Sequence, residues 1–297
     1  MNPLGVHESI SGGLHKAVEA AAAVGCDCVQ IFTKNSNQWK GKALTDKEID
    51  QFQAALEKWN ISHPISHDSY LINLGSPDDI LWNRSVAAME EEMLRAEALG
   101  IPYVVMHPGS YTTSSENEGL ERIIEGLQRV LEHTAGIQTR CLLENTAGQG
   151  TNLGWKFEHL ATIIQGVEGV VKEAKLGVCF DTCHAFAAGY DFTTAEKYQD
   201  VFQKFHKIIG LERIRAFHLN DATKECGSRI DRHAHIGHGK IGTVPFGFFL
   251  NDVHFQSIPM YLETPKGFCE TENGEEDWDV VNLRTLRELI RDIPAKE

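Results

Sequence analysis

The chain has 297 residues, of which 42% are hydrophobic and 24% are charged, a composition typical of a soluble globular protein. No apolar run approaches the ~20 residues of a membrane helix, and the start of the chain lacks the features of a signal peptide, so we expect a cytoplasmic protein with no membrane attachment. The formal net charge of −14 at pH 7, taken alone, argues against nucleic acid as a partner.

Short apolar runs that each end at a polar residue recur along the whole chain. The eight runs are 4–6 before His7, 28–32 before Thr33, Ile65 before His67, 103–106 before His107, 141–143 before Glu144, 176–180 before Asp181, 214–217 before His218 and 260–262 before Glu263. From position 67 onward, the intervals to 107, 144, 181, 218 and 263 are 40, 37, 37, 37 and 45 residues. Such spacing is close to one strand–helix unit, so each run is predicted to be a strand. Cysteines inside these runs are predicted to be reduced core thiols.

The segments between the runs are predicted to be helices. Thr45 and Glu48 have capping-box spacing, and 76–79 (SPDD) has the cap, proline and acids of a helix start. Apolar residues from 120 to 131 repeat at helical spacing, and a last helix is predicted from 277 to 293. Strands that alternate with helices imply a parallel sheet, and eight strands imply closure. The prediction is an α/β fold, a (β/α)8 TIM barrel, in a single domain over 1–297.

Ligand-type side chains should converge at one end of this barrel, because parallel strands deliver their C-terminal ends to the same face. A histidine at the end of one strand is more often only a hydrogen-bonded residue at the barrel rim. Here six strand ends carry such residues, and His184, Asp231 and His233 follow in nearby loops. The full set is His67, His107, Glu144, Asp181, His184, His218, Asp231, His233 and Glu263. Four carboxylates would repel one another without cations, and mixed imidazole and carboxylate ligands suit two or three zinc or manganese ions.

Long strings in the sequence carry a resemblance to one family. HDSYLINLG (67–75), MHPGS (106–110), LLENTAGQG (142–150), FDTCHAFAAGYD (180–191) and the segment 218–237 are similar to endonuclease IV, the trinuclear-zinc apurinic/apyrimidinic endonuclease. The similarity extends from GVHESISGGL to YLETP. It implies a DNA-repair hydrolase that uses a metal-bound hydroxide to cut the phosphodiester 5′ to abasic sites in double-stranded DNA, leaving a 3′-hydroxyl.

The resemblance also implies a division of the ligands among three zinc ions per chain, with manganese possible in one site. One zinc would lie on His67, His107 and Glu144; Glu144 would bridge to a second, held also by Asp181, His218 and Glu263. The third would take His184, Asp231 and His233. Glu144 and Glu263 are therefore the expected catalytic carboxylates. We expect the protein to act as a monomer.

Expected DNA contacts also follow from the resemblance. Tyr70 and Leu71 resemble an apolar wedge that enters the minor groove, the alternative being two rim residues packed on a neighbouring loop. The loop after 28–32 offers Lys34, Asn35, Gln38, Trp39 and Lys40 as donors, or forms only a solvated face. Asn37 stands where the family pattern has arginine, which removes a cation from that loop. His7 either contacts phosphate or caps the barrel. The charge of −14 is then placed on outward helices, with the metals making the DNA face positive.

Two other classes compete with this interpretation. A sugar isomerase or epimerase can use the same barrel with one or two metals, but Asp231, His233 and His184 would then have no role. A protein that binds damaged DNA without cutting it would not need all nine ligands.

Overall fold

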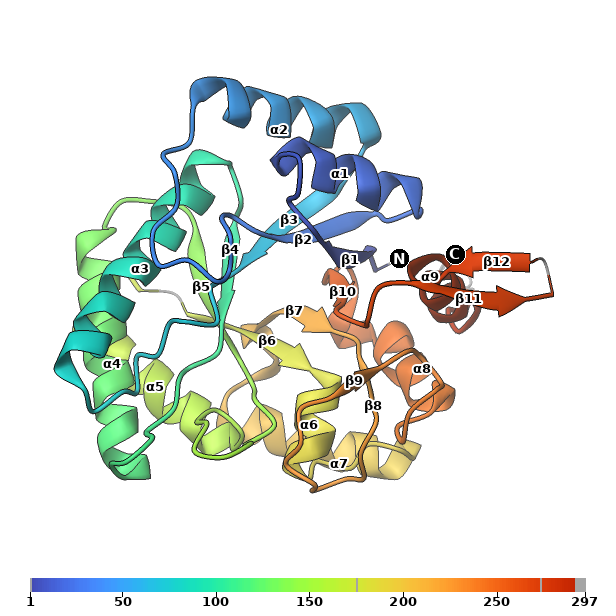
Figure 1. Ribbon diagram of the computed structural model, residues 1–297. Coiled ribbons are helices and arrows are strands. Elements are labelled where there is room, and N and C mark those ends of the chain that lie inside the picture. The colour runs from blue at the N-terminus through green and yellow to red at the C-terminus, as the bar shows by residue number, and fades with distance from the viewer. Residues whose placement is uncertain (1, 175, 273, 292–297) are drawn as a thin grey trace, which may run out of the picture.

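A closed barrel of eight parallel strands forms the centre of the molecule. The computed structural model describes residues 2–174, 176–272 and 274–291. The strands neighbour one another in the order β1-β10-β7-β6-β5-β4-β3-β2, and β1 pairs in parallel with both β10 and β2 to close the barrel. They are β1 (Leu4–Glu8), β2 (Cys28–Phe32), β3 (Ser62–His67), β4 (Tyr103–Met106), β5 (Arg140–Glu144), β6 (Gly177–Asp181), β7 (Ile214–His218) and β10 (Met260–Leu262). The predicted (β/α)8 fold is confirmed, and Figure 1 shows the helices surrounding the barrel.

Helices follow the strands and cover the outside of the barrel. They are α1 (Leu14–Ala23), α2 (Asp46–Trp59), α3 (Asp79–Ala98), α4 (Glu116–His133), α5 (Phe157–Val170), α6 (Thr182–Ala188), α7 (Ala195–Ile208), α8 (Thr243–Asn251) and α9 (Trp278–Glu288), with 3-10 turns at Leu211–Arg213 and Val253–Phe255. Within the described part of the chain, none of them is long and apolar enough to span a membrane.

Helix ends test the capping predictions. The capping box of Thr45 and Glu48 is confirmed: each side chain bonds the other residue's backbone N–H. The predicted start of α3 is two residues too early, because Asp78, not Ser76, accepts the N–H groups of Ile80 and Leu81 at 2.8 and 2.9 Å. Helix α9 ends at Glu288, before the predicted end at 293, a position that lies outside the described residues.

The barrel interior is a packed layer rather than a channel. It contains the buried side chains of Cys28, Ile65, Val105, Leu142, Cys179, Ala216 and Tyr261. Outward side chains of the strands instead join the larger core between strands and helices, where Phe180 contacts the rings of Phe217 and Phe249. All seven cysteines are free thiols, as expected. The filled interior leaves the strand ends as the place for chemistry.

Two small antiparallel sheets of two strands each lie in the segments that follow β7 and β10. β8 (Asp221–Ala222) pairs with β9 (His233–Ala234) within the segment that follows β7. β11 (Phe268–Thr271) pairs with β12 (Gly274–Asp277) and projects from the side of the barrel (Figure 1). Neither pair was predicted from the sequence, because strands of two to four residues give no measurable alternation.

Candidate metal centre

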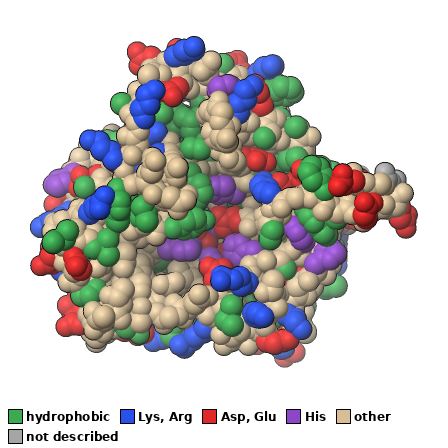
Figure 2. Space-filling model, viewed as in Figure 1, with side chains coloured by type: hydrophobic (Ala, Val, Ile, Leu, Met, Phe, Trp, Pro, Cys, Tyr) green, Lys and Arg blue, Asp and Glu red, His purple; other side chains and the backbone are tan. Residues whose placement is uncertain are grey.

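Nine ligand-type side chains meet at the C-terminal end of the barrel. His67, Glu144, Asp181 and His218 are the last residues of β3, β5, β6 and β7, and His107 and Glu263 each follow their strand by one residue. His184 comes from α6, and Asp231 and His233 from the segment after β7. Figure 2 shows histidine and acidic side chains gathered in a hollow at the centre of this face. The convergence expected from the strand spacing is therefore present.

The nine side chains form three groups whose ligand atoms lie within 4.8 Å of one another. The groups are His67, His107 and Glu144; Glu144, Asp181, His218 and Glu263; and His184, Asp231 and His233. Glu144 belongs to two groups, and its Oε2 lies 3.1 Å from His67 Nε2 while its Oε1 lies 3.0 Å from His218 Nδ1. The structure thus brings together the residues that the sequence analysis placed in each set.

A fourth grouping combines Asp181 and His233 with Cys183. The Cys183 thiol lies 3.7 Å from the carbonyl oxygen of Arg232 and donates to it. Burial raises the pKa of this thiol, so the thiolate that a metal requires is disfavoured. Cys183 is therefore a weaker candidate than His184, which shares a group with the same His233.

Backbone carbonyls orient three of the histidines. His67 Nδ1 lies 2.9 Å from the Asp68 carbonyl oxygen, His184 Nδ1 lies 3.0 Å from that of Asn145, and His233 Nδ1 lies 3.1 Å from that of Glu263. A carbonyl only accepts, so each Nδ1 must carry a hydrogen, and in the neutral ring that binds a metal ion the lone pair is then on Nε2. This is the arrangement found around metal-binding histidines, where a second hydrogen bond fixes the ring.

Two of those Nε2 atoms test whether the residues fit a metal ion. His184 Nε2 and His233 Nε2 are buried and have no hydrogen-bond partner among the described residues. They lie 3.1 and 3.4 Å from the two carboxylate oxygens of Asp231. A buried polar atom without a partner is costly, and a cation between imidazole lone pairs and a carboxylate removes that cost. The donor set fits a divalent ion of the zinc type.

Histidines and carboxylates in the centre shift one another's pKa values. Burial lowers the pKa values of His67, His184 and His218, but the surrounding carboxylates and, for His218, the Cys179 thiol outweigh burial and raise them well above 6.5. Burial opposes ionisation of Asp231, yet His184 and His233 lower its pKa to about 2. Cations binding here would therefore displace protons from these imidazoles, while Asp231 stays ionised.

The third group is assembled by a segment with its own anchors. Asp221, fully buried, accepts hydrogen bonds from the backbone N–H groups of Ala222, Gly237, Gly239 and Ile241 at 2.7–3.0 Å. Gln149 Oε1 accepts the N–H of Asp231 at 3.0 Å from across the site. Four bonds to one carboxylate close the segment into a fixed loop, so Asp231 and His233 are held over His184 without being part of the barrel.

Polar residues that the sequence analysis did not select connect the ligands. Gln30 is fully buried in β2; it donates to Glu263 Oε1 at 2.5 Å and lies 2.7 Å from His218 Nε2 through its own Oε1. Asn220 donates to Asp181 at 2.7 Å and accepts the N–H of Glu263 at 2.8 Å. A polar residue in the middle of the apolar run CVQIF was the available signal for Gln30.

The expected DNA contacts lie around the same hollow. Tyr70 is 63% exposed, with its ring 5.5 Å from that of Phe32, and Leu71 beside it is half-buried. His7 is half-buried, lies 2.9 Å from Gln30 and has an Nε2 without a partner among the described residues. The structure thus places these three side chains at the rim of the centre.

The loop after β2 presents a mixed set of side chains. Asn35, Gln38 and Lys40 are exposed, and Trp39 is half-buried under the guanidinium of Arg84, 4.4 Å from the ring centre. Lys34 is the exception, because its amine is buried and ion-paired with Glu92. The prediction that Lys34 is a free donor to phosphate is therefore wrong: burial of a lysine demands a carboxylate partner, and α3 supplies one.

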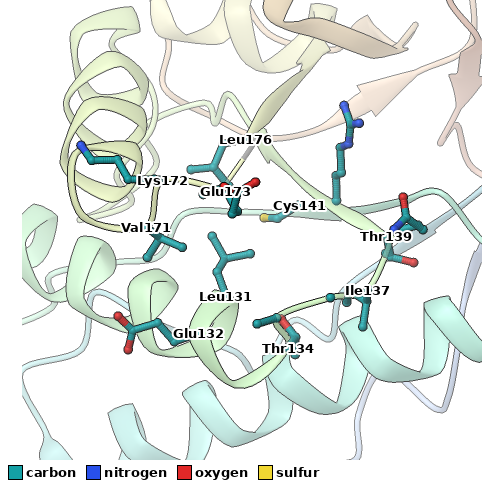
Figure 3. A pocket seen from close by; sticks show the side chains of 15 residues that line it. Leu131, Glu132, Thr134, Ile137, Thr139, Cys141, Val171, Lys172, Glu173 and Leu176 are labelled. Carbon is teal, nitrogen blue, oxygen red and sulfur yellow. The ribbon is translucent and has the colours of Figure 1, made fainter.

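A cavity of about 540 Å³ lies at the other end of the strands. It is lined by residues between Leu131 and Cys141 and by Val171, Lys172, Glu173, Ala174 and Leu176 (Figure 3). Arg140 begins β5 and Leu176 precedes β6, so the cavity lies at the N-terminal face, away from the convergent ligands. In barrels of this type that face serves stability rather than chemistry.

Comparisons with known proteins agree with this geometry in two steps. The model of the Xylose isomerase-like TIM barrel family matches residues 18–289, so the chain is a barrel of that class. A D-tagatose 3-epimerase-like protein shares the fold, with a TM-score of 0.68 at 20% identity over 97% of this chain and 96% of its own.

Relatives with higher sequence identity show which family within this class the chain belongs to. The probable endonuclease 4 of Citrifermentans bemidjiense is 47% identical over 290 residues, 98% of this chain and 99% of the relative. Endonuclease IV from Thermus thermophilus superposes with a TM-score of 0.81 at 38% identity, covering 97% of this chain and 98% of that one. The chain belongs to the endonuclease IV family.

Proposed function

We propose that this protein is an apurinic/apyrimidinic endonuclease that hydrolyses the phosphodiester on the 5′ side of an abasic site in duplex DNA, leaving a 3′-hydroxyl. The observation that carries the proposal is the third ligand group of His184, Asp231 and His233, in which two buried Nε2 atoms have no hydrogen bond to any described residue. Membership of the endonuclease IV family over nearly the full chain supports the same activity and its place in DNA repair.

We propose that the three groups hold three zinc ions, with manganese possible in one of them. When bound, such ions lower the pKa of water and neutralise phosphate oxygens, which is the chemistry that phosphodiester hydrolysis needs. Glu144, fully buried and shared by two groups, would hold two ions close together. Glu263, held by Gln30 and Asn220, would complete the middle site beside His218.

The protein's own side chains would select the abasic site. Tyr70 is exposed and braced by ring contacts with Phe32 and His67, at 5.5 and 5.7 Å. An aromatic side chain braced in this way can enter the minor groove and replace stacking at the lesion. A missing base lowers the cost of turning the nucleotide out of the helix, so abasic duplex is favoured over intact duplex. Leu71, Asn35, Gln38, Trp39 and His7 would add contacts to sugar and phosphate.

The sugar isomerase alternative is disfavoured by the third group, although the barrel is shared with epimerases. An isomerase that used the ions around Glu144 would have no use for the loop that Asp221 and Gln149 hold over His184. We further infer that the protein acts in the cytoplasm as a monomer formed by one domain.

A nicking assay tests the proposal. Purified protein is incubated with a duplex that carries one abasic site and, separately, with an intact duplex. The abasic reaction is repeated after treatment with a chelator, and the zinc content of the protein is measured by elemental analysis. We expect about three zinc ions per chain, incision only of the abasic strand and loss of incision after chelation. Fewer than two ions per chain, or turnover of a ketose without incision of DNA, would overturn the proposal.

A further inference from the structure

The loop after β2, residues 33–42, is fixed to α3 by a buried ion pair. Glu92 of α3 pairs through Oε1 with the Lys34 amine, and its Oε2 accepts the Thr33 hydroxyl at 2.6 Å. The side chains of Lys34 and Glu92 are only 3% and 2% exposed. A pair buried this deeply is sensitive to loss of either partner, since the other charge is then left without compensation.

Neighbouring side chains of α3 hold both ends of the same loop. The Arg95 guanidinium donates to the Thr33 carbonyl at 2.6 Å and to the Lys42 carbonyl at 2.7 Å, and Glu91 accepts the N–H of Gly41 at 2.8 Å. A Cβ on Gly41 would lie 3.0 Å from side-chain atoms of both Glu91 and Lys34, so the loop packs closely against these side chains at this position. Figure 1 shows this loop, between β2 and α2, passing over α3.

A further bond ties the loop to the Tyr70 turn. The Ser69 hydroxyl donates to the Ser36 carbonyl at 2.5 Å and accepts the N–H of Leu71 at 3.3 Å. Asn35, Asn37, Gln38 and Lys40 nevertheless remain exposed. The contacts with α3 and Ser69 therefore involve the inner residues and the backbone and leave the outer side chains free.

From these contacts we infer that Glu92 is a positioning residue for DNA: it fixes loop 33–42 and the Tyr70–Leu71 turn as one preformed surface before DNA binds. This inference rests on the proposed function. A loop ordered in advance loses less conformational entropy on binding, so Glu92 acts on affinity and leaves the chemical step alone. If loss of the ion pair leaves the loop correctly placed about a tenth of the time, the apparent Kd rises about tenfold.

The experiment compares Glu92→Gln with Glu90→Gln. Glu90 is on the same helix but pairs with His133, away from the loop. For Glu92→Gln we expect KM and Kd for an abasic duplex to rise about tenfold or more, with kcat and zinc content unchanged, and faster hydrogen exchange at amides 34–42 in the DNA-free protein. Glu90→Gln should match the parent in every measurement. Ser69→Ala is the second variant, for use if Glu92→Gln fails to fold. It removes the bond to Ser36 without leaving a buried charge, and its KM should rise by less than that expected for Glu92→Gln.

The readouts separate the possible failures. Unchanged KM and unchanged exchange in Glu92→Gln and Ser69→Ala would overturn the inference, as would a fall in kcat accompanied by loss of zinc. A parent protein that neither binds nor cuts abasic duplex would refute the proposed function instead. In that case the exchange rates in DNA-free protein would still decide whether Glu92 holds the loop.

Discussion

Replacement of Gln30 by methionine tests how the proposed metal centre is organised. Gln30 is fully buried, donates to Glu263 at 2.5 Å and accepts from His218 Nε2 at 2.7 Å, which leaves His218 Nδ1 facing the carboxylates. Methionine has a similar length and no amide, so Gln30→Met removes both of these bonds, together with the contact to His7, without opening a large cavity. His218 then loses the partner that fixes its tautomer, and Glu263 loses the donor that fixes its carboxylate.

The expected loss of zinc affinity can be estimated from these two hydrogen bonds. Hydrogen bonds to charged groups contribute about 1.5–3 kcal/mol each, but much of that is lost from the metal-free protein as well. Removal of partners that orient metal ligands typically lowers metal affinity by about 10–100-fold, which is about 1.4–2.7 kcal/mol. Among the zinc sites that Gln30→Met retains, we therefore expect the weakest to have a zinc affinity about 10–100-fold below that of the parent.

Competition against a chromophoric zinc chelator measures this affinity. Gln128→Met is the matched control, because Gln128 on α4 donates to the Gly166 carbonyl, at 3.1 Å, far from the ligands. The control should retain the affinity of the parent. Equal zinc affinity in Gln30→Met and Gln128→Met would refute the view that Gln30 orients His218 and Glu263.

Three further variants separate the roles of the proposed site residues. Glu144→Gln removes the charge shared by two groups, so elemental analysis should show loss of at least one zinc and a nicking assay should show no incision. DNA binding should fall much less. Near-normal turnover would exclude the bridging role. Tyr70→Ala should weaken binding of abasic duplex in a fluorescence titration with zinc unchanged, and unaltered affinity would make Tyr70 a rim residue only. The double variant with Asp231→Asn and His233→Asn should lose one zinc and cleave about a thousandfold more slowly in a single turnover, because a cation that stabilises the charge of the transition state is lost. Undiminished cleavage with two zinc ions would show that the third group is structural.

The sequence predicted the barrel well because its strands are separated by regular intervals and each ends in a residue of distinct chemistry. His67, Glu144, Asp181 and His218 could be placed on one face from that pattern alone. The grouping into three sets needed the family resemblance, since strand order does not say which carboxylate is shared.

Contacts between distant segments could not be predicted in the same way. Lys34 looked like an exposed loop cation, and only the packing of α3 against the loop shows that Glu92 pairs with it, 58 residues along the chain. The start of α3 was misplaced because Ser76 and Asp78 are both good caps, and their competition is settled by local backbone geometry. Gln30 was missed because the function of a buried amide depends on partners from β7 and from the end of β10.

The pairing of β1 with β10 has a consequence for how the protein folds during synthesis. Leu4 lies opposite Met260, so the barrel cannot close until more than 250 residues have left the ribosome. Until then the edges of β1 and β7 are unpaired, and open edges of apolar strands favour association with other chains. Closure also brings Glu263 to His218, which means that the last strand to arrive completes both the sheet and the middle ligand group. A nascent chain that stalls before residue 260 would therefore be both aggregation-prone and without a complete metal centre, and chaperone dependence should be greatest at that length.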